Sequence, residues 1–323
     1  MSLDSDLIVD RRRIRRKLTF WRVLAVAVAV VALVTVGLVV APVGITTSGA
    51  IARISIEGLI RSDNDRVAAL ERLEKSSAAA VIVHINSPGG TTAGSEQLYD
   101  ALLRLKAKKP MVVVVEGLAA SGGYIAALAS DHIIAQQSSL VGSIGVLFQI
   151  PNFSELLKTV GIKVEEVKSS PLKAAPNGFE PTSPEARAAL EALVKDSFAW
   201  FRELVQARRG MNDAALMRVA DGRVFTGRQA IDLKLIDQLG DEKTAVAWLV
   251  SEKKIKSELP VKDFKLTPKF GDLTFLRAAA AISLDVLGLD GIARRVEQSG
   301  VVGAVEAAGI DGMLALWRPA ASN

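Results

Sequence analysis

Short apolar runs alternate with helically spaced apolar positions through the first half of the chain. Residues 112–115 are four successive valines and residues 78–85 are almost entirely apolar, which is typical of strands buried on both faces. Residues 51–60 alternate apolar and polar side chains, as a half-buried strand does. Helices are predicted over residues 67–75 and from Thr91 or Thr92 onward. This alternation predicts an α/β fold with parallel strand pairing.

The second half of the chain is dominated by one long helical pattern. Residues 183–185 combine a capping serine, a proline at the first helical position and an acidic residue, so they predict a helix that runs to about residue 209. A short helix is predicted over residues 153–160, a strand over residues 164–167 and an irregular loop over residues 168–181.

A long apolar run near the N-terminus predicts a membrane anchor. Residues 23–41 form 19 residues without a charge, and at about 1.5 Å per residue such a helix spans most of a bilayer core. Residues 1–22 carry seven cations and three anions, which predicts that this end stays cytoplasmic and that the rest lies across the membrane. A cleaved signal peptide and a buried core helix are the alternatives. The length of the run and its basic flank favour an anchor.

Composition narrows the possible chemistry. Half of the residues are apolar, enough for a sizeable core, and the net charge is +5. Four of these five charges lie in residues 1–22, so the main body has no basic pattern for nucleic acid. The chain has no cysteine and two histidines, His84 and His132. We therefore expect no disulfide, no metal site and, because no P-loop or dinucleotide fingerprint follows a strand, no bound cofactor.

Composition and pattern together divide the chain into five segments. The pattern weakens after about residue 251, and no internal repeat is visible. The segments are a basic cytoplasmic N-terminus (1–22), a transmembrane anchor (23–41), a linker (42–50), an α/β domain (51–250) and a C-terminal extension of unknown role (251–323).

Two successive predicted strands each end in a Gly-Gly turn that opens a helix. Residues 86–90 read Asn-Ser-Pro-Gly-Gly and residues 121–124 read Ser-Gly-Gly-Tyr. Because the carboxyl ends of parallel strands share one edge, both turns are expected at one pocket. Ser121 precedes a helix predicted over residues 124–129, where free N–H groups favour negative charge, as an acyl-transfer nucleophile requires. From this stretch alone, simple helix capping is the favoured interpretation of the serine.

A nucleophilic serine also needs a base. His132 lies about 15 Å further along the predicted helix, which is too far for a hydrogen bond, and His84 sits in a buried strand as a satisfied core histidine would. The remaining residue type is lysine, which acts as a base only where burial lowers its pKa. Lys173, in the sequence Pro-Leu-Lys-Ala-Ala-Pro, is our candidate. Lys163 and Lys168, which border a predicted strand, remain alternatives.

Several strings, taken in order, resemble the bacterial signal peptide peptidase A (protease IV) family. The resemblance covers residues 51–250 and contains one copy of the catalytic unit, as in the short form of that family. The strings are Asn-Ser-Pro-Gly-Gly at 86–90, Ala-Ser-Gly-Gly-Tyr at 120–124, Gly-Ser-Ile-Gly-Val at 142–146, Lys173, and Ala-Asp-Gly-Arg-Val-Phe-Thr-Gly at 220–227.

The resemblance implies a fold, a mechanism and partners. It implies a ClpP/crotonase-like fold of repeated β-β-α units and a serine–lysine peptidase, with Ser121 as nucleophile and Lys173 as general base. Gly89 and Gly122 would donate backbone N–H groups to the oxyanion. The family forms a homo-oligomeric ring whose neighbouring subunits contribute serine and lysine. The implied substrates are remnant signal peptides, at a catalytic domain on the periplasmic side of the bacterial inner membrane.

Two other functions compete with this interpretation. A crotonase-type acyl-CoA enzyme would use the same pair of backbone amides, but CoA substrates are cytoplasmic and the predicted body is not. A membrane scaffold, in which Ser121 only caps a helix, would need no base at all. A serine-directed acylating probe separates these classes, because labelling of Ser121 that depends on Lys173 is expected of the peptidase alone.

Overall fold

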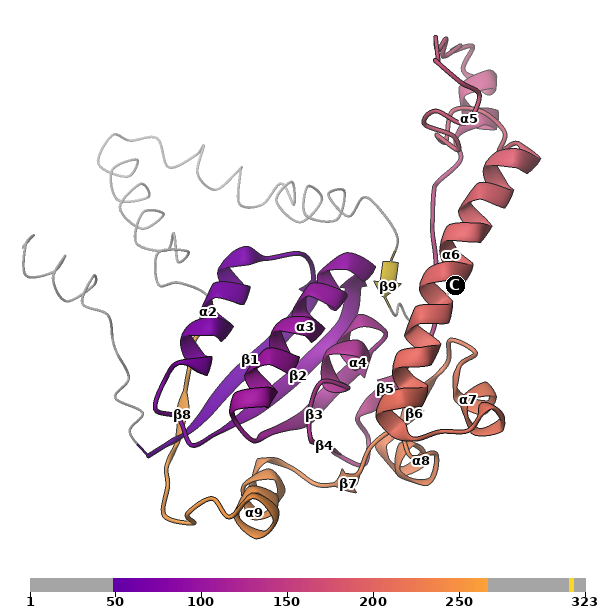
Figure 1. Cartoon of the computed structure of the whole chain (residues 1–323). Helices are drawn as coiled ribbons and strands as arrows, with labels where there is room; N and C mark the ends of the chain where they lie inside the picture. The colour runs from indigo at the N-terminus through magenta and orange to yellow at the C-terminus, as the bar shows by residue number, and fades with distance from the viewer. Residues whose placement is uncertain (1–48, 267–313, 317–323) are drawn as a thin grey trace, which may run out of the picture. The chain divides into compact units, whose positions relative to one another are not determined.

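The computed structural model describes residues 49–266 and 314–316 (Figure 1). The chain separates into two compact units, Met1–Thr46 and Thr47–Asn323, and all described residues belong to the second. The predicted cytoplasmic N-terminus, the anchor at 23–41 and most of the predicted linker lie outside the described residues. Among the helices of the described part, none is both long and apolar enough to cross a bilayer.

The described strands form one mixed sheet in the order β6-β5-β3-β2-β1-β8. β1, β2 and β3 are parallel, and β3 pairs with β4 along its first half and with β5 along its second. β5–β6 and β2–β9 are antiparallel. The predicted parallel α/β core is confirmed. The strands are β1 (Ile51–Ile60), β2 (Ala80–Thr91), β3 (Met111–Ala120), β4 (His132–Ala135), β5 (Leu140–Gly142), β6 (Val224–Thr226), β7 (Gln238–Leu239), β8 (Val261–Asp263) and β9 (Leu314–Leu316).

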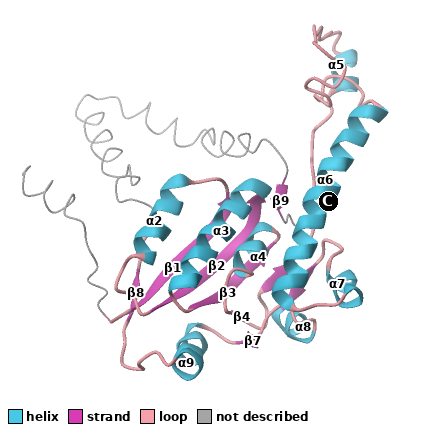
Figure 2. Ribbon diagram, in the orientation of Figure 1, coloured by secondary structure: helices cyan, strands magenta, loops and turns pink. Residues whose placement is uncertain are grey.

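Helices α2, α3 and α4 lie against one face of the sheet (Figure 2), and α9 packs on the other. The four valines of β3 explain the layers: Val113 and Val115 join the core under α2, α3 and α4, whereas Val112 and Val114 join the core under α9. Successive side chains on a strand point to opposite faces, so a continuous valine run serves two cores. The helices are α2 (Asn64–Glu74), α3 (Thr92–Lys108), α4 (Gly122–Ala127), α5 (Ser154–Thr159), α6 (Pro184–Arg209), α7 (Asp213–Val219), α8 (Gly227–Asp232) and α9 (Glu242–Lys253).

The structure corrects the predicted elements at three places. β2 continues through the Gly-Gly turn to Thr91 instead of ending before it. The strand predicted over residues 164–167 is wrong, because these residues pair with no other strand. Val167 is fully exposed, so the backbone there can form its hydrogen bonds with water instead of with a neighbouring strand. The sheet also extends past residue 250, because β8 pairs with β1, with Val261 opposite Ile51.

A cluster of charged side chains links α9 and β8 to the central strands β1 and β2 through hydrogen bonds. Arg53 of β1 donates to both carboxylate oxygens of Glu242, at 2.5 and 2.6 Å, and to Asp263 at 2.7 Å. Its hydrogen bond to Glu242 lowers the pKa of that carboxyl. The two ring nitrogens of His84 lie 2.7 Å from Glu116 and 2.8 Å from Glu242. His84 is therefore a satisfied structural histidine, as predicted.

Candidate active site

Ser121 joins β3 to α4 in a backbone conformation that residues other than glycine rarely adopt. Its φ is +52° and its ψ is −116°. Such geometry costs on the order of 1–3 kcal/mol and is concentrated at functional sites. The residue is only 1% exposed. The turn thus holds one serine rigidly at the carboxyl edge of a central strand, where parallel sheets bind their ligands.

The Ser121 hydroxyl has no hydrogen-bond partner among the described residues. Although Ser121 occupies the N-cap position of α4, its side chain makes no capping bond. An unpaired buried hydroxyl costs about 1–3 kcal/mol, so native structures seldom retain one without a use. The capping role that the local sequence favours is therefore wrong, and the hydroxyl is available for chemistry.

The strained turn is oriented by Gly142 of β5. The Ser121 N–H donates to the Gly142 carbonyl at 2.8 Å, and β5 pairs with the end of β3 so that Gly142 stands opposite Ala120. Gly142 has a φ of +101°, and a Cβ there would lie 3.2 Å from Cδ2 of Phe225. The glycine supplies both the required backbone conformation and the space.

We expect Gly142→Ala to slow modification of Ser121 by a serine-directed acylating probe about 10- to 100-fold. The reason is that moving a reacting group by about 1 Å can lower the reaction rate by up to about 100-fold. The substitution forces a side chain into a left-handed conformation and against Phe225. Gly145→Ala is the matched control, since its Cβ would meet only ordinary van der Waals contact, 3.4 Å from Gly222. Equal labelling rates in the two variants, measured by mass spectrometry, would contradict the orienting role.

The two Gly-Gly turns meet at one edge, as the sequence predicts. Ser87 of β2 pairs with Ala119 of β3, and a Cβ on Gly123 would lie 2.6 Å from the Ser87 carbonyl oxygen. The start of α4 therefore rests directly on β2 at Ser87, just before its Gly-Gly pair, at a separation that only glycine permits.

The two predicted oxyanion donors, the backbone N–H groups of Gly122 and Gly89, differ in their hydrogen bonding. Gly122 is the first residue of α4, so its N–H has no partner within the helix. The Gly89 N–H instead donates to the Ser87 hydroxyl at 3.1 Å, and that hydroxyl donates to the Gly58 carbonyl at 2.6 Å. Gly89 can therefore stabilise an oxyanion only after it exchanges this internal bond.

Lys173 does not reach Ser121 within one chain, because the Ser121 hydroxyl has no partner in the described structure. Lys173 is exposed in a turn beyond α5, and Figure 1 shows α5 at the end of α6 that is remote from the sheet. The 26 residues of α6 correspond to a length of about 39 Å. Apart from Ala186, the buried residues of α6 are in its C-terminal half, including Phe201 and Val205.

We call residues 146–196, which include α5, the Lys173 loop and the first half of α6, the arm. All but two of the exposed large apolar side chains in the described part of the chain belong to it. Exposed apolar surface of this extent marks an interaction site. The apolar side chains are Leu147, Phe153, Leu156, Val160, Ile162, Val164, Val167, Leu172, Phe179 and Leu193.

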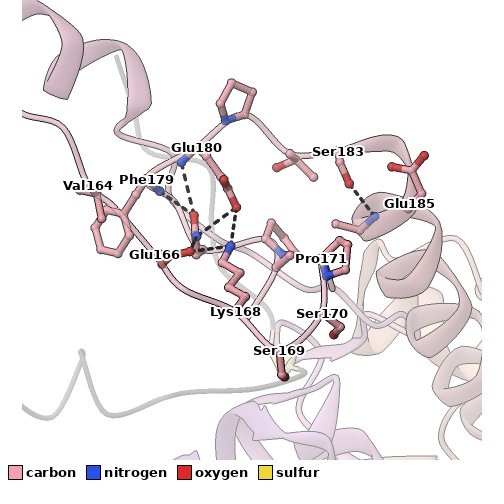
Figure 3. Close-up of a pocket in the computed structure, with 16 residues that line it drawn as sticks. Val164, Glu166, Lys168, Ser169, Ser170, Pro171, Phe179, Glu180, Ser183 and Glu185 are labelled. Carbon is pink, nitrogen blue, oxygen red and sulfur yellow. Dashed lines mark hydrogen bonds and ion pairs between the residues drawn. The ribbon is translucent and has the colours of Figure 1, made fainter. Parts of the chain in front are cut away.

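Lys168 is unsuited to act as a base. Its ammonium group lies 2.5 Å from Glu166 and 2.7 Å from Glu180, beside a cavity of about 650 Å³ within the arm (Figure 3). The hydrogen bonds to Glu166 and Glu180 raise the Lys168 pKa, which keeps the amine charged. Lys163 is exposed, like Lys173, and stays an alternative.

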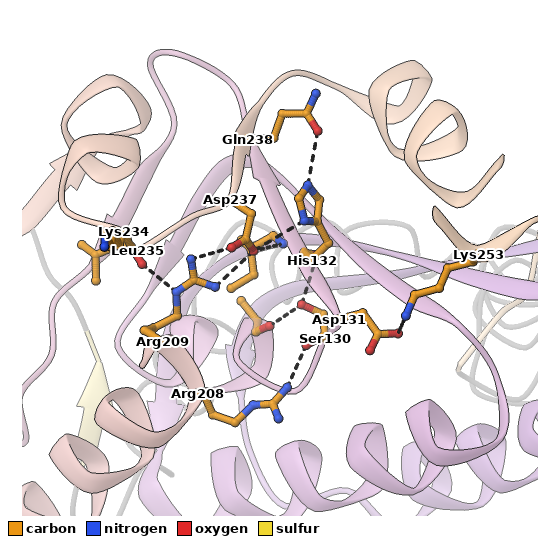
Figure 4. A network of polar contacts seen from close by, with 12 residues as sticks. Ser130, Asp131, His132, Arg208, Arg209, Lys234, Leu235, Asp237, Gln238 and Lys253 are labelled. Carbon is orange, nitrogen blue, oxygen red and sulfur yellow. Dashed lines mark hydrogen bonds and ion pairs between the residues drawn. The ribbon is translucent and has the colours of Figure 1, made fainter. Parts of the chain in front are cut away.

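His132 begins β4, beyond the end of α4, and belongs to a polar network there (Figure 4). One ring nitrogen is 3.2 Å from Gln238. In the same network Arg208 of α6 donates to the carbonyl of Leu128, the C-cap of α4, so α6 is fastened to the helix that Ser121 begins. No histidine approaches Ser121, and residues 49–266 and 314–316 contain no acidic, histidine or cysteine cluster arranged for a metal ion.

Sequence reasoning did not single out Ser87 and Gly142 as site residues. The hydroxyl of Ser87 bonds to a carbonyl 29 positions away, and the Gly142 carbonyl receives the Ser121 N–H across two paired strands. Both residues lie within strings that resemble the peptidase family, so the motifs marked the right segments. The individual roles depend on strand register, which no local pattern specifies.

Comparison with known proteins gives consistent matches. The model of peptidase family S49 matches residues 103–256, and that of the Clp proteases matches residues 53–139. A Synechocystis protein named as a protease is 36% identical over 209 residues, which cover 64% of this chain and 76% of that protein. An Enterococcus faecium protein named as a signal peptide peptidase is 31% identical over 188 residues, which cover 58% of this chain and 55% of that protein.

Among solved structures, a ClpP1 variant from Listeria monocytogenes superposes with a TM-score of 0.41 at 16% identity. The match covers 61% of this chain and 93% of that structure. The described sheet and the Clp protease match together support a ClpP-like α/β fold.

Proposed function

The chain belongs to peptidase family S49, and we propose that it is a membrane-anchored serine endopeptidase that degrades remnant signal peptides with a Ser121–Lys173 dyad. That it is a serine peptidase follows from the family. The observation that supports Ser121 as its nucleophile is the strained, buried serine whose hydroxyl has no partner in the described structure.

In the proposed mechanism, Lys173 in its uncharged form accepts the Ser121 proton as the serine oxygen attacks the peptide carbonyl. The tetrahedral oxyanion accepts hydrogen bonds from the Gly122 N–H and from the Gly89 N–H, once Gly89 has left the Ser87 hydroxyl. Collapse releases the amine product with the proton from Lys173 and leaves an acyl-enzyme on Ser121. Lys173 then activates water, which hydrolyses the acyl-enzyme and restores the serine.

A second copy of the chain would supply Lys173. Within residues 49–266 and 314–316 of one chain the Ser121 hydroxyl is unpaired, and Lys173 lies on the exposed arm. We therefore propose that each site is incomplete until an arm from a neighbour covers it. The apolar side chains of the arm support this, because burying them against a neighbour removes their surface from water. A heterologous contact of this kind forms a ring when the rotation between neighbouring subunits closes, which is the assembly we propose.

The proposed substrate and location rest on the sequence. The apolar run at 23–41 and its basic flank support a single anchor with the peptidase domain on the periplasmic side. A peptidase tethered there meets apolar peptides that remain in the membrane. The name of the Enterococcus faecium relative, a signal peptide peptidase, points to the same substrate class.

A membrane-impermeant serine-directed acylating probe tests both the nucleophile and its location. We expect the probe to label Ser121 in intact spheroplasts, and peptide mapping by mass spectrometry identifies the labelled serine. Inside-out vesicles should become labelled only after detergent is added. Labelling of inside-out vesicles without detergent would overturn the location, and absence of Ser121 labelling even in detergent would overturn the nucleophile.

A further inference from the structure

The loop that carries Lys173 begins and ends in one cluster of polar side chains (Figure 3). The ammonium group of Lys168, at the start of the loop, lies 2.7 Å from the carboxylate of Glu180 at its end. The same ammonium group lies 2.5 Å from Glu166. The Asn177 side-chain amide donates to Glu166 at 2.8 Å and to Glu180 at 3.2 Å. We call Glu166, Lys168, Asn177 and Glu180 the clamp.

Side chains, and not a backbone ladder, hold the two ends of this loop together. Residues 168–180 contain no helix or strand, and in the described part of the chain no backbone–backbone hydrogen bond involves residues 163–169. The other end of the loop is fixed independently, because the Gly178 carbonyl accepts the Phe153 N–H at 2.7 Å. The position of the start of the loop relative to its end therefore depends on the clamp.

Two short turns fix the backbone around Lys173. The Lys173 N–H donates to the Ser170 carbonyl at 3.1 Å, and the Ala175 N–H donates to the Leu172 carbonyl at 3.3 Å. These turns give the tip of the loop its local shape, but each joins residues that are three positions apart. The orientation of the whole tip is set where the two ends of the loop meet, at the clamp.

We propose that Lys168 is a positioning residue for the base Lys173. By binding Glu166 and Glu180 at once, its ammonium group closes the loop and fixes the orientation in which a neighbouring copy meets Lys173. This inference rests on the dyad proposed above. A base acts only within hydrogen-bond reach of the proton that it accepts, and a shift of about 1 Å can lower the rate by up to about 100-fold. A loop with unjoined ends would not hold Lys173 within that tolerance.

The two lysines need opposite charge states. The hydrogen bonds to Glu166 and Glu180 raise the pKa of Lys168, so this lysine stays protonated at a pH at which Lys173 has to be uncharged to act as a base. One exposed ion pair contributes little to stability. The clamp is instead a network, in which one cation bridges two carboxylates and the Asn177 amide joins the same two.

Lys168→Met tests the positioning role, because methionine keeps much of the apolar stem of lysine but cannot bind a carboxylate. We expect kcat for a peptide substrate to fall about 10- to 100-fold with KM nearly unchanged, since the base is misplaced. Lys168→Arg should recover most of the activity, because a guanidinium group also binds carboxylates. Lys158→Met is the matched control. Lys158 lies 2.8 Å from Glu155, three positions away in α5, so this ion pair closes no loop.

Two further measurements separate positioning from a general structural role. If Lys168 acts through Lys173, Lys168→Met should slow acylation of Ser121 by a serine-directed probe no further in a chain that already carries Lys173→Ala. Hydrogen exchange supplies a readout that needs no catalysis. Amides within residues 170–180 should exchange several-fold faster in Lys168→Met than in the wild type, whereas Lys158→Met should leave their exchange unchanged.

The outcomes distinguish this inference from the proposed function. A wild-type kcat or unchanged hydrogen exchange in Lys168→Met would overturn the inference, and so would rate losses that multiply in the double variant. These results would leave the Ser121–Lys173 dyad standing. Full activity of Lys173→Ala would instead remove Lys173 as the base, and the positioning role of Lys168 would fall with it.

Discussion

Replacing Ser121 with alanine is expected to abolish peptide cleavage while leaving the protein at least as stable as the wild type. Loss of a serine nucleophile typically lowers kcat by at least about 10⁴-fold. The stability expectation is specific to this structure. The Ser121 hydroxyl is buried without a partner in the described structure, so its removal relieves a penalty of about 1–3 kcal/mol and breaks no bond. Thermal or chemical unfolding measures the change.

Ser139→Ala is the matched control for this prediction. Ser139 is also buried, but its hydroxyl donates to the Glu116 carbonyl at 2.6 Å and accepts the Gln136 N–H at 3.1 Å. Its removal should lower the free energy of unfolding by about 1–3 kcal/mol and should spare cleavage at temperatures where the variant is folded. Cleavage by Ser121→Ala, or a loss of stability as large as that of Ser139→Ala, would contradict the assignment of Ser121 as a dedicated nucleophile.

Lys173→Ala is expected to lower kcat to a similar degree, yet mixing it with Ser121→Ala should restore activity. If each site joins a serine from one copy with a lysine from the next, random co-assembly at equal amounts leaves about a quarter of the sites with both groups. Co-expression with two affinity tags, tandem purification and a peptide cleavage assay would measure this recovery. The expectation follows from the separation of Lys173 and Ser121 within one chain.

Two controls sharpen the complementation experiment. Lys163→Ala removes another exposed lysine of the arm and should retain full activity. A doubly substituted chain, with both Ser121→Ala and Lys173→Ala, should show no recovery when mixed with Ser121→Ala, because no copy then offers a serine. An inactive mixture of the two single variants, when native mass spectrometry shows that they co-assemble, would place serine and base in the same chain or identify a different base.

The local sequence was sufficient to predict much of the scaffold. Four consecutive valines predicted the central strand, because a strand with helices on both faces must be apolar on both, and Val112–Val115 divide between the two cores. Ser183, Pro184 and Glu185 predicted the start of α6, because capping and the first turn involve residues within three positions of one another. The strand predicted over 164–167 failed because a strand also needs a partner, which the local sequence does not supply.

The sequence by itself determined which serine and which glycine turns form the candidate site. The tertiary structure decided the hydrogen bonds and the positions of these residues. In the part of the chain that the structure describes, the Ser121 hydroxyl has no partner, the Gly89 N–H donates to Ser87, the Ser121 N–H donates to Gly142, and Lys173 lies on the arm. The physical reason is the separation along the sequence over which each kind of interaction acts. Propensity and capping act over a few residues, whereas these bonds join strands whose register and open edges exist only after the whole sheet has formed.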